Sequence, residues 1–224
     1  MFDKILYNQL ASLEYIKTVL PLELLDRFTN DRYLLGHSIN VLNFSYMLGL
    51  ELGMPEKRLM QVSLGALMHD IGKLECCDSI LMASVLTEVQ RKAIQRHPTV
   101  GARMLSEIPM FEEITSCIIF HHERYNGGGY PSGVRAEDLP VEVRIVTIAD
   151  SFDAMISKRP FRSSIPRSLV NAQNELVKCS GTQFDPDMVK IFNKIISNNT
   201  IEIILGLSEA VNCVDHYIAK SCSL

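Results

Sequence analysis

Residues 32–52 read RYLLGHSINVLNFSYMLGLEL, and this stretch decides the fold class. Its apolar side chains recur every three or four residues, which is the spacing typical of an α-helix. Gly53 and Pro55 then end the predicted helix. The same period, repeated along a chain, predicts a protein built from packed helices.

Helical spacing continues on both sides of this segment, and no alternation typical of a β-strand appears. Residues 5–28 form an amphipathic pattern that Pro21 interrupts. Residues 124–140 contain four glycines and two prolines and are predicted to form an irregular loop. The remaining predicted helices are 56–69, 87–96, 99–107, 111–122, 141–157, 166–179, 186–196 and 200–219.

These patterns predict an all-α protein that folds as a compact helical bundle. We expect an N-terminal helical segment over residues 1–30, a central domain over 31–196 and a C-terminal helical extension over 197–224. The chain has no apolar run of 18 residues and no signal peptide, so we expect no membrane span and a cytoplasmic location.

The composition narrows the possible partners. The 224 residues carry a net charge of −4 at pH 7, and the pI is about 5.9. This balance argues against a broad basic surface for DNA, RNA or anionic membranes. Trp is absent and only 7% of the residues are aromatic, which disfavours a surface that stacks nucleic-acid bases. A small anionic ligand at a locally positive site is still compatible with these numbers.

Histidine and aspartate supply the chemistry of the sequence. The residues concerned are His37, His69, Asp70, His97, His121, His122 and Asp150. Imidazole nitrogen with carboxylate oxygen is a ligand set for Fe, Mn or Zn. Neighbours on a helix point about 100° apart, so neither doublet, at 69–70 or 121–122, is expected to chelate one ion side by side. The doublets would instead serve two ions with an aspartate between them, and two metals about 3.5–4 Å apart are a known arrangement for attacking phosphoesters.

Several motifs, in order over residues 33–192, resemble the HD-GYP family, a branch of the HD-domain metal-dependent phosphohydrolases. Their combination is far more specific than a single His-Asp doublet. They are His69-Asp70-Ile71-Gly72-Lys73, His97-Pro98, His121-His122-Glu123, Gly129-Tyr130-Pro131, Ala149-Asp150 with Asp153-Ala154, Arg159-Pro160-Phe161-Arg162 and Phe184-Asp185-Pro186.

The resemblance implies a helical bundle of HD-domain type and a phosphodiesterase that opens cyclic di-GMP to linear pGpG and possibly GMP. It implies two divalent ions, Fe or Mn with Zn as a further possibility, held by His37, His69, Asp70, His97, His121, His122 and Asp150. By the same resemblance, Lys73 and Asp70 are catalytic. The implied substrate-binding residues are Lys73, Tyr130, Asp153, Arg159 and Arg162.

The chain also departs from the family pattern. Tyr33 stands where some members carry a glutamate ligand for a third metal, so a two-metal site and the product pGpG are favoured. Residues 82–85, Asn126, Ala136 and Phe161 also differ from the usual residues. These departures leave two alternatives open. One is a hydrolase of cyclic GMP-AMP or another nucleotide, and the other is a catalytically weak module that senses a cyclic dinucleotide or binds a GGDEF-type protein. A homodimer is a further expectation.

Overall fold

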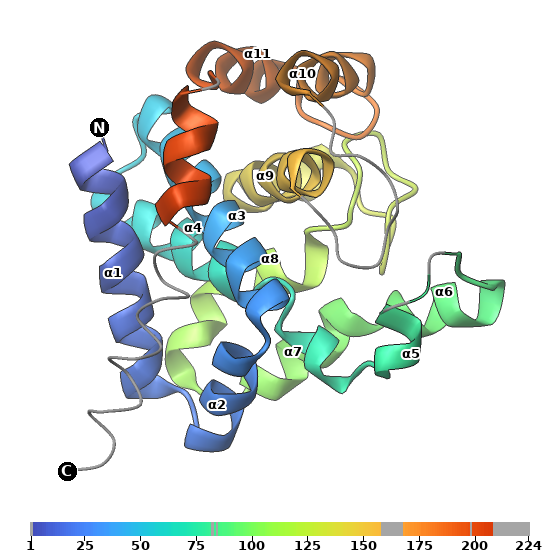
Figure 1. Ribbon diagram of the computed structural model, residues 1–224. Coiled ribbons are helices and arrows are strands. Elements are labelled where there is room, and N and C mark those ends of the chain that lie inside the picture. The colour runs from blue at the N-terminus through green and yellow to red at the C-terminus, as the bar shows by residue number, and fades with distance from the viewer. Residues whose placement is uncertain (1, 82, 84, 158–167, 198, 208–224) are drawn as a thin grey trace.

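The computed structural model describes residues 2–81, 83, 85–157, 168–197 and 199–207. Helices dominate this part of the chain, and its only β-type pairing is a single bridge between Ser180 and Phe184 (Figure 1). The all-α prediction is therefore confirmed. The elements are α1 (Phe2–Val19), α2 (Leu22–Asn30), α3 (Arg32–Glu51), α4 (Glu56–Met68), η1 (Ile71–Glu75), α5 (Asp78–Leu81), α6 (Glu88–Ile94), α7 (His97–Leu105), η2 (Pro109–Ile114), α8 (Thr115–Phe120), η3 (Ala136–Asp138), α9 (Val141–Ile156), α10 (Leu169–Lys178) and α11 (Pro186–Ile195).

Helix α3 is the central element of the bundle. It begins at an N-cap in which the Asp31 carboxylate accepts a hydrogen bond from the Leu34 amide at 2.9 Å. Nearly every residue from Leu34 to Gly49 is buried, because α4 and α9 pack along it on different sides. The segment is helical as predicted, but it is buried all round, so polar side chains such as Asn40 and Ser45 also lie inside.

Three phenylalanines join α3 to α9 and α11. Phe44, Phe152 and Phe192 are fully buried, one from each helix. Their ring centroids lie 5.2, 6.1 and 5.0 Å apart with edge-to-face orientation, the arrangement that aromatic quadrupoles favour. Helices α10 and α11 close the bundle over α9 (Figure 1).

Helix α1 buries apolar residues such as Ile5, Leu13 and Ile16 in the core, but polar residues share that buried face. Leu6 and Leu10 are exposed, whereas Asn8, Gln9 and Ser12 are buried. The buried polar groups have partners: the Asn8 amide donates to Ser63 Oγ at 3.0 Å, and Asn43 Nδ2 donates to Gln9 Oε1 at 2.8 Å. Gln9 Nε2 also donates to a carbonyl of the helical segment 199–207. The core-facing side of α1 is thus chosen by hydrogen bonds as well as by apolar burial.

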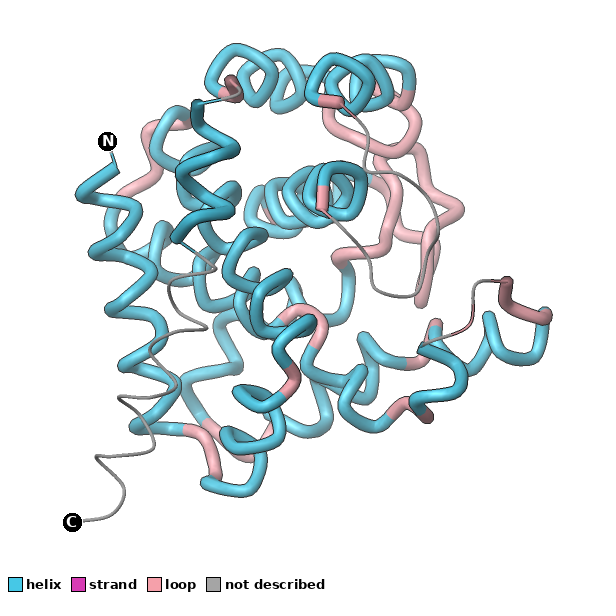
Figure 2. The backbone as a smooth tube through the Cα atoms, in the orientation of Figure 1, coloured by secondary structure: helices cyan, strands magenta, loops and turns pink. Residues whose placement is uncertain are grey.

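The irregular chain gathers beside α9 (Figure 2). Residues 124–140 form the predicted loop, interrupted only by the short helix η3. The loop is held to residues 182–183 by backbone hydrogen bonds from Tyr125 and Asn126, at 3.1 and 3.0 Å. No helix among the described residues is long and apolar enough to cross a membrane.

The aromatic cluster predicts a large stability effect. Phe192→Ala removes a fully buried ring, which typically costs about 3–5 kcal/mol of unfolding free energy. Val177→Ala on the exposed side of α10 is the matched control and should change stability by less than about 0.5 kcal/mol. Urea denaturation followed by circular dichroism measures both. Equal effects from the two substitutions would contradict the packing described here.

Candidate metal centre

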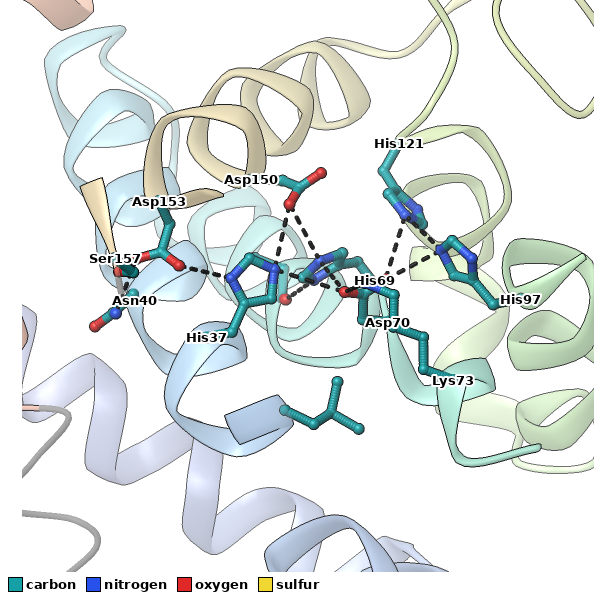
Figure 3. Close-up of polar contacts among 12 residues, drawn as sticks. His37, Asn40, His69, Asp70, Lys73, His97, His121, Asp150, Asp153 and Ser157 are labelled. Carbon is teal, nitrogen blue, oxygen red and sulfur yellow. Dashed lines mark hydrogen bonds and ion pairs between the residues drawn. The ribbon is translucent and has the colours of Figure 1, made fainter. Parts of the chain in front are cut away.

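Five separate segments of the chain bring seven side chains to one place in the middle of the bundle. Figure 3 labels all of them except His122. Their potential ligand atoms form two groups, and within each group all atoms lie within 4.8 Å of one another. The first group is His37 from α3, His69 at the end of α4 and Asp150 from α9. The second group is Asp70 after α4, His97 at the start of α7, and His121 and His122 at the end of α8.

The carboxylate of Asp70 lies between the two groups. Its Oδ2 is 3.5 Å from His37 Nε2 and 3.3 Å from His69 Nε2. Its Oδ1 is 3.0 Å from His97 Nε2 and 3.7 Å from His121 Nε2. Each oxygen of one carboxylate therefore faces a different group, which is the arrangement of an aspartate that bridges two cations.

Hydrogen bonds fix the tautomers of the imidazoles. Nδ1 of His69, His97 and His121 lies 2.7, 2.7 and 2.9 Å from the carbonyl oxygen three residues earlier in the chain. A carbonyl only accepts, so each Nδ1 carries the hydrogen and each Nε2 keeps a free lone pair. His37 follows the same logic, with its Nδ1 2.6 Å from a carboxylate oxygen of Asp153.

The resulting lone pairs converge in a way that suits a cation. His97 Nε2 and His121 Nε2 lie 3.2 Å apart, and two lone pairs at that distance repel unless a positive charge lies beside them. Within the described chain, His69 Nε2 and Asp70 Oδ1 are buried and make no hydrogen bond. Buried polar atoms without a partner are costly, so the residues fit metal ions at these positions.

The pKa values of His121, His122 and Asp70 agree with two neutral imidazoles and an ionised carboxylate in the second group. Burial lowers the pKa of His121 well below its usual value, and the adjacent His122 lowers it further. Burial lowers the pKa of His122 to about 3. Burial by itself would raise the pKa of Asp70, but Lys73 and His69 outweigh it and hold that pKa well below the usual range. Neutral imidazole and ionised carboxylate are the forms that bind metals.

His37 behaves differently because two carboxylates face it. Burial lowers its pKa, but Asp150 and Asp153 more than offset this and raise the pKa to about 9. Without a cation, a proton on His37 balances these acids. A metal ion in the first group would take the place of that proton, so metal binding and proton release are coupled here.

The prediction that neighbouring residues cannot share one ion is wrong for the second doublet. His121 and His122 belong to the same group, with ring centroids 4.1 Å apart. Helix α8 ends at Phe120, so the angle of about 100° between neighbours on a regular helix does not apply. His69 and Asp70 do serve different groups, with Asp70 between them as expected.

Asp153 was expected to contact substrate, and the structure shows it buried behind His37. Its side chain is 2% exposed. Oδ2 lies against Nδ1 of His37, and Oδ1 accepts hydrogen bonds from Asn40 Nδ2 at 2.8 Å and Ser157 Oγ at 2.7 Å. Asp153 therefore orients His37 from behind (Figure 3), as carboxylates commonly orient metal-binding histidines.

The remaining expected substrate residues differ in what the structure shows. Lys73 donates a hydrogen bond to Asp70 Oδ2, so its ammonium lies at the metal centre. The ring of Tyr130 lies 4.7 Å from that of His122, centroid to centroid, and burial raises the pKa of its phenol, so the hydroxyl remains protonated and can donate. Arg159 and Arg162 lie outside the described residues.

Gly72 allows the chain just after Asp70 to pack closely against the start of α7, where His97 lies. It lies in η1, which contacts α7. A Cβ atom at residue 72 would lie 2.0 Å from the His97 carbonyl oxygen and 2.6 Å from the amide nitrogen of Gly101. Both obstacles are backbone atoms, so only glycine at this position leaves Asp70 and His97 within reach of one another.

The sequence analysis did not identify Asn40, Ser157 or Glu123 as functional. Asn40 lies one helical turn after His37, and Ser157 lies one turn after Asp153, so both could have been found from the helical period. Glu123 directly follows the second histidine doublet, but its partners are backbone amides in a loop. No side-chain pattern predicts such a contact.

Comparison with known proteins agrees with this centre. A family model described as the HD domain matches residues 23–188. A cyclic di-GMP phosphodiesterase of Thermotoga maritima is 36% identical over 148 residues, which are 65% of this chain and 40% of the relative. The 3′3′-cGAMP-specific phosphodiesterase 3 of Vibrio cholerae is 30% identical over 168 residues, which are 74% of this chain and 36% of the relative. The chain spans about two fifths of the length of these curated relatives.

Solved structures show the same helical arrangement. Bd1817, an HDGYP protein from Bdellovibrio bacteriovorus, aligns with a TM-score of 0.63 at 22% identity and covers 87% of this chain and 64% of that structure. A cyclic GMP-AMP-specific phosphodiesterase of Vibrio cholerae aligns with a TM-score of 0.58 at 20% identity, over 94% of this chain and 53% of that structure. At these identities the likeness supports the fold alone.

The position of Asp153 predicts an effect on metal affinity. Asp153→Asn keeps the size of the side chain but removes the charge that holds the His37 ring. We expect affinity for Mn²⁺ to fall about 10- to 100-fold, the usual cost of losing such a partner. Competition with a chromogenic chelator measures this affinity. Asp138→Asn, at an exposed position in η3, is the control, and an equal affinity for all three proteins would contradict the orienting role.

Proposed function

The chain belongs to the HD-domain family, in its HD-GYP branch, and on this premise we propose that it is a metal-dependent phosphodiesterase that hydrolyses cyclic di-GMP. The observation that carries the proposal is the carboxylate of Asp70, with one oxygen directed at each group of imidazoles. Such a pair of sites supports phosphoester hydrolysis better than it supports a structural metal, because structural sites are normally closed, single-ion sites.

The proposed ligands divide between two divalent ions. His37, His69 and Asp150 would hold one, and His97, His121 and His122 the other, with Asp70 shared. We expect Fe or Mn, with Zn also compatible with the donor set. When bound, the pair of ions supplies activation of water and stabilisation of charge on the phosphoryl oxygens.

Protein side chains around the centre define what it would bind. Lys73 keeps a positive charge beside Asp70, and a cyclic dinucleotide carries two negative phosphates. Tyr130, whose phenol stays protonated and whose ring lies next to that of His122, would donate a hydrogen bond to substrate or stack against it. A small cationic site on a protein of net charge −4 favours a compact dianion over a nucleic-acid polymer.

Tyr33 bears on the product. Its ring lies nearly parallel to that of His37, with centroids 6.4 Å apart, at the position where a third-metal ligand is found in some family members. A phenol in place of a carboxylate supports two ions rather than three. We therefore propose linear pGpG as the main product, with further cleavage to GMP as the slower reaction.

Cyclic GMP-AMP is the second candidate substrate. It is supported by the Vibrio cholerae relatives described as specific for 3′3′-cGAMP. These relatives and the cyclic di-GMP phosphodiesterases match overlapping parts of this chain at similar identity. A sensing module without catalysis, a GGDEF-type partner and a homodimer stay predictions of the resemblance.

The proposed activity predicts a specific product. Protein loaded with Mn²⁺ or, anaerobically, Fe²⁺ should convert cyclic di-GMP to pGpG, faster than cyclic GMP-AMP when both are present at equal concentration. Asp70→Asn should lower the rate at least about 100-fold, the usual scale for removing one group that stabilises charge in a transition state. Liquid chromatography of the products measures both, with Asp138→Asn as the control.

Two results would contradict this proposal. Preferred cleavage of cyclic GMP-AMP would replace the substrate, and no cleavage of either dinucleotide by the metal-loaded protein would remove the enzymatic function.

A further inference from the structure

Glu123 is a buried acid next to the metal centre to which the proposed reaction assigns no role. It directly follows His122, and its residue is 2% exposed. A carboxylate in such a place is costly unless hydrogen bonds and a nearby positive charge compensate it. The partners of its two oxygens therefore show what the residue does.

One oxygen of Glu123 holds the loop that carries Tyr130. Oε1 accepts hydrogen bonds from the backbone amides of Ser132 at 2.6 Å and Gly133 at 2.9 Å. Both residues are exposed, so burial does not hold this stretch of the loop in place. Bonds from amides to an ionised carboxylate are among the stronger hydrogen bonds in proteins.

The loop also lies directly against the backbone of the histidine doublet. The amide of Tyr130 donates to the carbonyl oxygen of His122 at 3.3 Å. A Cβ atom on Gly129 would lie 2.5 Å from both Glu123 Cα and the His122 carbonyl oxygen. Glycine at residue 129 permits this contact, and Glu123 fastens the loop on the far side of Tyr130.

The second oxygen of Glu123 lies in a different environment, beside a small polar cavity. Oε2 is buried and has no hydrogen-bond partner among the described residues, and the same holds for Nε of Arg144. Glu123 and Arg144 line one cavity of about 10 Å³, together with Thr147 and Asp185. That volume suits a single water molecule, and the polar lining offers it several partners.

Helix α9 contributes Arg144 and Thr147 to this cavity and, one turn after Thr147, Asp150 to the metal centre. Arg144, Thr147 and Asp150 follow at intervals of three residues. Arg144 Nη1 donates to Asp185 Oδ2 at 2.6 Å, and Asp185 caps helix α11. Thr147 Oγ1 donates to the carbonyl oxygen of His121 at 2.9 Å. The cavity is therefore enclosed by elements that are themselves fixed.

We propose that Glu123 is a positioning residue that fastens the Tyr130 loop to the metal centre, with one water molecule bridging its second oxygen to Arg144. The Arg144 guanidinium balances the buried charge through this water. The consequence for catalysis rests on the proposed function, since Tyr130 is a substrate residue only if that proposal holds. The fastening of the loop can be tested without it.

Hydrogen exchange of the loop amides is the direct test. In the wild-type protein the amides of Ser132 and Gly133 should be protected although both residues are exposed. Glu123→Gln, which keeps an acceptor but loses the charge, should accelerate their exchange about three- to tenfold, and Glu123→Ala should accelerate it more. Glu137→Gln, in the exposed turn η3, is the matched control and should leave the loop unchanged.

A kinetic measurement then separates positioning from folding. With the dinucleotide that the wild type cleaves, Glu123→Gln should raise KM about tenfold and lower kcat less than threefold, at unchanged metal content. Combining it with Tyr130→Phe should add little to the effect of Tyr130→Phe alone. A merely structural role would instead lower metal content and stability together.

Two outcomes would overturn the proposal: loop exchange in Glu123→Gln equal to that of wild type, or additive effects with Tyr130→Phe. Should the wild type cleave no dinucleotide, the proposed function fails, while the exchange rates still decide whether Glu123 fastens the loop. If Glu123→Ala does not fold, Glu123→Gln decides.

Discussion

One shared carboxylate constrains the whole structure. Asp70 is 1% exposed and faces imidazoles from four different parts of the chain. A charge so placed is tolerated only where positive charge compensates it, as Lys73 does and as bound cations would. The ends of α4 and α8, the start of α7 and one face of both α3 and α9 must therefore meet at this point. The backbones pack so closely at Gly72 that a single carbon added to this residue would collide with the backbone at His97.

Most of the metal-facing histidines lie at helix ends, and this has a physical reason. His69, His97 and His121 each bond through Nδ1 to a carbonyl three residues earlier. Such a bond fixes the ring and directs Nε2 inward without a second side chain. His37 lies inside a helix whose carbonyls are engaged, so it needs Asp153 instead, and Asp153 needs Asn40 and Ser157. Both kinds of support direct Nε2 inward, and on His37 a bound cation would take the place of the proton that Asp150 and Asp153 favour.

Much of this arrangement follows from the sequence, and the parts that do not have identifiable causes. The hydrophobic period predicts the helices well because it reflects burial, as at residues 32–52. It does not predict that Asn8 and Gln9 share the buried face of α1 with Ile5 and Ile16, because these polar residues are selected by partners far away in the chain. The expectation that adjacent residues point about 100° apart also fails for His121 and His122, because helix α8 ends before them, at Phe120.

The residue types of the centre are evident from the sequence, but their roles depend on contacts across the fold. Asp153 and Asp150 are one turn apart and chemically identical, yet one lies behind His37 and the other faces the centre. Glu123 belongs to a motif that carries the family resemblance, but its contacts are recognisable only once the loop at 132–133 is placed beside it. The sequence thus identifies the side chains that can bind a metal, and tertiary packing decides which of them face the metal centre.

Asp70 lies between the two groups of candidate ligands, so we expect it to bridge two cations. Crystals of the Mn²⁺-loaded protein, measured at a wavelength where manganese scatters anomalously, test it most directly. We expect two anomalous peaks about 3.5–4 Å apart, one on each side of the Asp70 carboxylate. A single peak, or peaks away from Asp70, would contradict it.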